Sequence, residues 1–247
     1  MAGLTAWQLV FCALVIASAF AVRGTAGFGG GAVAVPLMAL ALPVQVVVPV
    51  VAVLNLLAST GQAIRHWKNI VWREVAFTIP FTVLGVAAGT YLLNQLDSAL
   101  LRKGLGVFVV TYAVFAFVTA KRPLRAPRAL VRPLGGVLST AAGFVGALFG
   151  GAAGPLYAIY LGNLDLARDV FRVTVTTMLL VQAALRAVGY AGLGFYDSTT
   201  LLLLVVALPF MWLGGRLAEH IAGRIEPHVF ARIIGGVLLI SGSALLF

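Results

Sequence analysis

Two glycine clusters in apolar sequence are the features most able to do chemistry. The first is Gly27-Phe-Gly-Gly-Gly31, within the apolar stretch 22–40, and the second is Phe149-Gly-Gly151, followed by Gly154-Pro155. Glycine favours helix breaks, and a helix that restarts after a break exposes free N–H groups and about half a positive charge. Because glycine has no side chain, an anion can approach that backbone closely. We therefore expect both clusters to break helices and to line a site for one small anion.

Polar side chains near these clusters would complete such a site. Arg186 lies nine residues before the end of an apolar run, and Arg23 lies four residues before Gly27, the start of the first cluster. A charge inside an apolar segment is by default a functional hypothesis, although snorkelling towards the interface is an equal alternative for Arg186. Hydroxyl and amide groups would add donors, with interhelical hydrogen bonding as the alternative use of the amides. The expected substrate-binding set is Arg23, Thr25, Gly27, Gly29, Gly30, Gly31, Gln62, Thr140, Gly150, Gly151, Gly154, Gln182 and Arg186.

Other interpretations of the glycines are weaker or fail. Gly27-x-x-x-Gly31 also fits the small-residue motif that packs membrane helices together, so packing alone remains an alternative. Gly27-x-Gly29-x-x-Ala32 matches the dinucleotide fingerprint, but no βαβ unit or acidic partner surrounds it. Neither cluster precedes Lys-Ser or Lys-Thr, as an ATP-binding loop would require. We expect no cofactor and no bound metal.

The elements that position these residues must be membrane helices. The chain has 247 residues, of which 62% are hydrophobic and 10% charged, against about 25% charged in soluble domains. Uncharged runs of roughly the ~17–25 residues that span a bilayer cover residues 44–64, 75–93, 104–120, 199–215 and 233–247. The net charge is +10, and the basic residues lie mostly between the runs. This distribution indicates membrane orientation rather than nucleic-acid binding. The fold class expected is an all-α, polytopic protein embedded in a lipid bilayer.

The sequence contains an internal repeat. Pro80-Phe81-x-x-Leu84-Gly85 recurs 129 residues later as Pro209-Phe210-x-x-Leu213-Gly214, and further pairs follow in the same order. Such repeats are the usual architecture of secondary transporters. We expect a first membrane repeat over 1–120, a basic cytoplasmic linker over 121–133, and a second membrane repeat over 134–247. Each repeat would hold one glycine-broken helical hairpin and three transmembrane helices.

The basic residues indicate how the repeats are oriented. If each glycine-rich segment crossed the membrane once, eight Lys and Arg would lie on the linker side and seven on the other. If each segment turns back to its own side, the numbers become thirteen and two. The second arrangement satisfies the positive-inside rule, so the repeats are expected to be inverted, with both termini outside. Residues 134–161 are only 28 residues, too few for two crossings of ~20 each, which favours re-entrance there; the first hairpin is left open.

The glycine clusters resemble a known family. A glycine cluster followed by proline (Gly27 to Pro36), with a second copy after a basic linker (Phe149 to Pro155), is similar to the hallmark of the sulfite exporter TauE/SafE family. The resemblance covers nearly the whole chain, including the duplication. It implies a bacterial cytoplasmic-membrane permease for sulfite, organosulfonates or related organic acids. The second cluster departs from the commoner three-glycine form, since Ala152 takes the third place.

We therefore expect a multi-pass secondary transporter, not an enzyme, that exports a small sulfur oxyanion or organosulfonate. Outward movement of an anion is downhill by ~2.3 kcal/mol per charge per 100 mV in an inside-negative cell, so export needs no coupling ion. Ion-coupled import of organic anions is the first alternative, and a membrane scaffold without transport the second. Neither H-E-x-x-H nor G-x-S-x-G is present to indicate catalysis. Oligomeric state is left open, a homodimer included.

Overall fold

The structure, a computed structural model, is helical throughout the part of the chain that it describes. It describes the backbone of residues 4–26, 29–119, 126–150, 153–221 and 227–246, and no strand occurs among them. The all-α class is confirmed. The elements are α1 Ala6–Ala26, α2 Gly30–Met38, α3 Val44–Arg65, the 3-10 helix η1 Trp67–Asn69, α4 Trp72–Gln95, α5 Ser98–Thr119, α6 Arg128–Phe149, α7 Ala153–Leu161, α8 Arg168–Gly192, α9 Ser198–Ile221 and α10 Pro227–Leu246.

Helix lengths follow the same order in both halves of the chain. A long helix, a short helix and three long helices run from α1 to α5, and the same order runs from α6 to α10. In the described residues, seven helices are long and apolar enough to cross a membrane: α1, α3, α4, α5, α6, α8 and α9. By contrast α2 and α7 have nine residues each, only ~13 Å of helix at 1.5 Å per residue. The polytopic membrane architecture is confirmed, with one half-length helix in each half.

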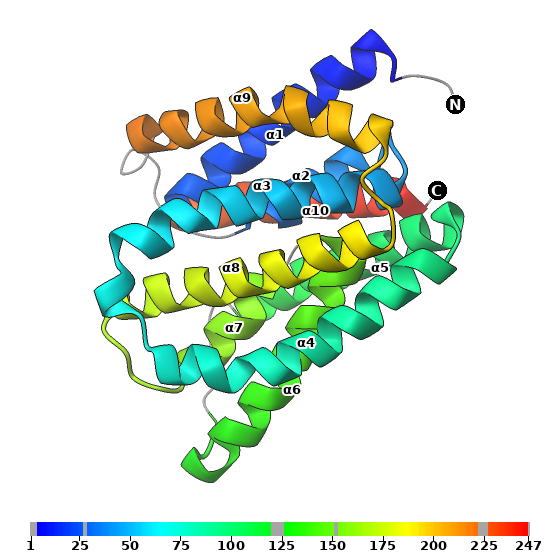
Figure 1. The fold of residues 1–247 in the computed structure, drawn as a ribbon. Coiled ribbons are helices and arrows are strands. Elements are labelled where there is room, and N and C mark those ends of the chain that lie inside the picture. The colour runs from blue at the N-terminus through cyan, green and yellow to red at the C-terminus, as the bar shows by residue number, and fades with distance from the viewer. Residues whose placement is uncertain (1–3, 27–28, 120–125, 151–152, 222–226, 247) are drawn as a thin grey trace.

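The packing of the helices is also duplicated. In Figure 1, α1 and α9 lie together at the top, α3 and α8 in the middle, and α4 and α6 below. Exchanging each helix of the first half with its counterpart converts the α1–α9 contact into α6–α4 and the α3–α9 contact into α8–α4, and both members of each pair occur. Each short helix packs on the long helix before it and the one after it. The central helices α3 and α8, which come from different halves of the chain, therefore pack against each other.

The repeated Pro-Phe-x-x-Leu-Gly sequence has a structural role in both copies. A Cβ added to Gly85 on α4 would overlap the backbone of α6 at Thr140, and one added to Gly214 on α9 would overlap the backbone of α1 at Ala17. Both glycines therefore let two helix backbones touch, as small residues do in membranes. The duplicated motif marks two equivalent helix crossings between the halves.

One end of the bundle carries most of the basic residues. Figure 1 places the end of α3 and of α9 and the starts of α4, α6 and α8 at the same (left) end. These segments contain Arg65, Lys68, Arg73, Arg128, Arg132, Arg168, Arg172 and Arg216, whereas Arg102 and Lys103 lie at the start of α5, at the opposite end. The basic end is the expected cytoplasmic side, and the inversion of the repeats across a membrane stays a prediction. Because α6 begins at Arg128, the last residues of the expected linker are helical.

Filling one of these crossings should destabilise the fold. Gly85→Val places a side chain against the α6 backbone, and we expect the free energy of unfolding to fall by about 1–3 kcal/mol, the usual cost of overpacking. Thermal unfolding in detergent measures the loss. Gly61→Val is the matched control, because a Cβ at Gly61 on α3 meets nothing within 4 Å. Equal stability of the two variants would contradict the packing role of Gly85.

Candidate functional site

The first glycine cluster ends in a helix start with free N–H groups. Gly29, the residue before α2, has a left-handed φ of 98°, and no side chain caps the helix. The first backbone bond runs from the Val33 N–H to the Gly29 carbonyl at 3.2 Å, so the N–H groups of Gly30, Gly31 and Ala32 have no partner within the helix. These three residues are buried, yet a Cβ at Gly29 would meet nothing within 4 Å. Open space therefore lies beside Gly29, whereas Gly30 and Gly31 are closely packed.

The two glycine clusters meet in the interior. A Cβ on Gly31 would overlap the carbonyl oxygen of Gly150, the residue that ends α6 with a left-handed φ of 70°. A Cβ on Gly150 would lie 2.7 Å from Val35 on α2. The predicted convergence of the two breaks is thus present in the described residues, although Gly27 and Gly151 lie outside them. The half-length helix α7 then starts at buried Ala153 and Gly154.

Arg23 lies beside the start of α2. Its guanidinium donates to the Asn55 side-chain oxygen at 2.8 Å and to the Ser59 hydroxyl at 2.5 Å, both on α3. The stem of Arg23 borders Gly30, and the side-chain nitrogen of Asn55 is 3.0 Å from where a Gly31 Cβ would stand. Because its oxygen accepts from Arg23, Asn55 presents its NH₂ donors to α2. A guanidinium and an amide thus flank the free N–H groups.

Arg186 occupies a corresponding place against the end of α6. Its guanidinium donates to the Gly146 carbonyl, while Gln182 and Tyr190, one turn to either side on α8, donate to the Ala142 and Ala147 carbonyls. A cation near the C-terminal end of a helix is favoured by the helix dipole. The side chains of Gln182 and Arg186 therefore hold α8 against the last turns of α6, next to the break at Gly150.

Neither buried arginine has an acidic partner among the residues that the structure describes. Arg23 is 6% exposed and Arg186 is 3% exposed, and among the described residues the one ion pair joins Arg132 and Glu74 instead. Within the described part of the chain, Arg186 Nε has no hydrogen-bond partner, and neither has the Thr90 hydroxyl, which borders Gly189 one turn away on α8. Buried charges are ordinarily paired, and each unsatisfied buried polar group asks for a water or an ion. In the described residues, therefore, no negative charge balances either arginine.

The remaining predicted site residues lie elsewhere or outside the described part. Thr140 donates to the Gly136 carbonyl and lines a groove between α4 and α6, away from the glycine breaks. Gln62 is half-buried near the end of α3, one turn beyond Ser59. The side chain of Thr25 is outside the described residues. Ser59 was missed as a candidate residue, although its spacing with Asn55 and Gln62 along α3 is a signal for one helix face.

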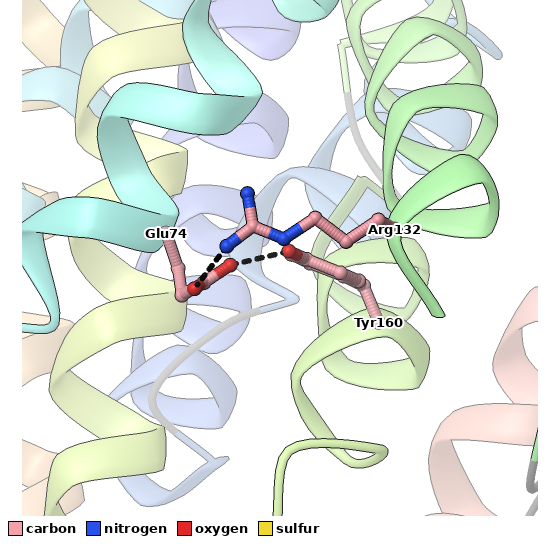
Figure 2. A network of polar contacts seen from close by, with 3 residues as sticks. All are labelled: Glu74, Arg132 and Tyr160. Carbon is pink, nitrogen blue, oxygen red and sulfur yellow. Dashed lines mark hydrogen bonds and ion pairs between the residues drawn. The ribbon is translucent and has the colours of Figure 1, made fainter. Parts of the chain in front are cut away.

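A second polar network was also missed by sequence reasoning. Glu74, in the first turn of α4, is buried. It accepts a hydrogen bond from the Tyr160 hydroxyl and forms an ion pair with Arg132 at 3.3 Å. Figure 2 shows these three side chains converging from α4, α6 and α7. Tyr157, one turn earlier on α7, bonds the Thr82 hydroxyl of α4 at 2.9 Å. Two tyrosines therefore fix α7 to a helix of the first repeat.

Comparison with known proteins identifies the family. The family model for sulfite exporter TauE/SafE matches residues 11–245, nearly the whole chain. The chain belongs to this family. The resemblance inferred from the glycine clusters is confirmed, and with it a membrane transporter.

A curated relative supports the same assignment. The chain is 26% identical over 198 residues to a probable inner membrane transporter protein, TsaS, of Comamonas testosteroni, covering 79% of this chain and 80% of the relative. No solved structure matches the chain. Together with the seven spanning helices, these findings make it a multi-pass protein of the inner membrane.

Bulky residues at the breaks should stop transport without preventing membrane insertion. Gly29→Val has room for its side chain but needs a left-handed φ, at a cost of roughly 1–2 kcal/mol, and it would fill the space before α2. Gly150→Val adds a clash with Val35. We expect both variants to lose anion flux in vesicles while their yield in the membrane is kept. Gly61→Val is the control; wild-type flux in both glycine variants would contradict a role of the breaks in binding.

Proposed function

We propose that the chain is a secondary transporter that moves a small sulfur-containing oxyanion, sulfite or an organosulfonate, out of the cell. The observation that carries the proposal is the pair of buried guanidinium groups, Arg23 and Arg186, that flank the meeting point of the two glycine breaks without any acidic partner among the described residues.

Electrostatics around α2 favours an anion over any other ligand. The start of a helix carries about half a positive charge, and Arg23 lies beside it, where a cation is repelled rather than attracted. Asn55 and Ser59 satisfy Arg23 as hydrogen-bond acceptors but do not neutralise it. Several donors and a full charge next to the open space beside Gly29 are a suitable environment for an oxyanion, because its oxygens only accept hydrogen bonds.

The first break is the stronger half of the proposed site. Arg186 already donates to the Gly146 carbonyl near the negative end of α6, whereas Arg23 lies beside a positive helix end. In α7, Pro155 has no N–H to offer at the third helical position, so α7 presents fewer donors than α2. We therefore assign the main anion contacts to the start of α2, Arg23 and Asn55, and a supporting charge to Arg186.

The direction proposed follows from the membrane potential. An anion leaving an inside-negative cell gains ~2.3 kcal/mol per charge per 100 mV, whereas concentrative uptake would need a coupling ion. Vesicles that contain the protein should show sulfite flux towards the positive side of the membrane, and this flux should increase with the imposed potential. Flux that ignores voltage and requires a proton gradient would overturn the export proposal in favour of ion-coupled import.

Removing either buried charge should weaken anion transport. A charge-assisted hydrogen bond contributes roughly 1.5–3 kcal/mol, so Arg23→Gln and Arg186→Gln should raise the sulfite concentration for half-maximal flux by about 10- to 100-fold. We expect the larger effect at Arg23. Arg102→Gln, at an exposed arginine of α5, is the control. If both variants keep the wild-type concentration dependence, the arginines have a structural role only.

A further inference from the structure

A long apolar groove runs between α4 and α6 on a side of the protein away from the glycine breaks. It has a volume of about 760 Å³ and is lined by Phe77, Phe81, Gly85, Ala88, Arg132, Pro133, Gly136, Val137, Thr140, Ala141 and Phe144. Along α6 the lining runs from Arg132 to Phe144, ~18 Å at 1.5 Å per residue. One leaflet of hydrocarbon is ~15 Å deep, half of ~30 Å. The groove matches the length of one leaflet.

The chemistry of the groove changes at one end. Its walls are apolar except for Thr140, whose hydroxyl is bonded to the Gly136 carbonyl, and Arg132, whose side chain is 47% exposed. Arg128 is also exposed and lies one turn earlier on the same face of α6. Arg132 and Arg128 belong to the basic end of the bundle, where the membrane surface is expected.

The guanidinium of Arg132 is held at the mouth of the groove. Glu74 accepts one of its N–H groups at 3.3 Å, and its central carbon stands 4.7 Å above the ring of Phe77, itself a groove residue. Figure 2 shows the guanidinium fixed beside Glu74. Arginine has five N–H donors and a planar fork that matches a phosphate, so most of its donors remain for a ligand.

We propose that this groove binds an anionic phospholipid, with its phosphate on Arg132 and Arg128 and one acyl chain along α4 and α6. The charge argues for it: two copies packed groove to groove would bring their arginines together, because the described lining of the groove contains no acid. An apolar groove of one leaflet's length, ending in cations at the interface, has the chemistry of a headgroup site between helices.

The lipid site is separate from the proposed anion pathway but is connected to it structurally. Arg132 contacts Glu74, and Glu74 accepts from Tyr160 on the half-length helix α7. A phosphate on Arg132 would therefore act at one end of the network that fixes α7. The proposal does not depend on which substrate is transported, because its tests measure lipid binding.

Lipid selectivity of the purified protein tests the site. We expect phosphatidylglycerol to raise the midpoint of thermal unfolding more than phosphatidylcholine does at equal concentration, and native mass spectrometry to retain bound phosphatidylglycerol. The double variant Glu74→Gln/Arg132→Gln removes the cation without leaving a buried carboxylate unpaired. Val137→Trp fills the groove from a position that is 67% exposed. Both variants should lose the preference for phosphatidylglycerol.

A matched substitution outside the groove controls for the added ring. Val205→Trp replaces a valine that is 65% exposed on α9, and it should keep the lipid preference. The proposal is overturned if the wild type does not distinguish the two lipids, or if Val137→Trp keeps the preference. It is likewise overturned if Val137→Trp converts a dimer to a monomer with lipid selectivity unchanged, because the groove would then be an interface between copies.

Discussion

The close approach of Gly31 to the Gly150 carbonyl is the constraint on which the centre of this protein depends. At this point the start of one broken helix touches the end of another, from the opposite half of the chain, and no side chain fits between them. Gly29 and Gly150 both have a left-handed φ, and the helical hydrogen bonding is interrupted at each of them. The polar backbone that this leaves is kept inside the protein, away from lipid, as a bilayer requires.

Around this contact, the side chains of α3 and α8 make different polar contacts. On α8, three donors spaced one turn apart satisfy carbonyls near the end of α6, so that polar backbone is paired. On α3, Asn55 and Ser59 accept from Arg23 instead, and the N–H groups of α2 are left without a partner in the helix. The two halves share an architecture but not a charge distribution, which agrees with the unequal glycine clusters in the sequence.

The sequence predicted features that arise from composition and local chemistry. It did not predict which residues far apart in the sequence come into contact. Helix breaks at Gly29 and Gly150 follow from the conformations that glycine alone adopts easily, and the duplicated Pro-Phe-x-x-Leu-Gly motif correctly indicated equivalent positions. Thr140 was chosen for its nearness to the second cluster in sequence, yet almost three turns of helix separate it from Gly150. Glu74 stands in the first turn of α4, at the end of a span, yet it is buried. Its burial arises from Tyr160, 86 residues away, a contact that no local pattern encodes.

The unequal attachment of the two half-length helices has a consequence for motion. α7 is fastened to α4 by the hydroxyls of Tyr157 and Tyr160, whereas α2, with the sequence GGAVAVPLM, has no side chain able to form such a bond. Apolar contacts are non-directional, so a small slide of α2 would exchange one set of neighbours for another at little enthalpic loss, while α7 would have to break two directional contacts. Displacement during a transport cycle would therefore be easier for the amino-terminal half-helix, and its carboxy-terminal counterpart would serve as the fixed side of the pathway.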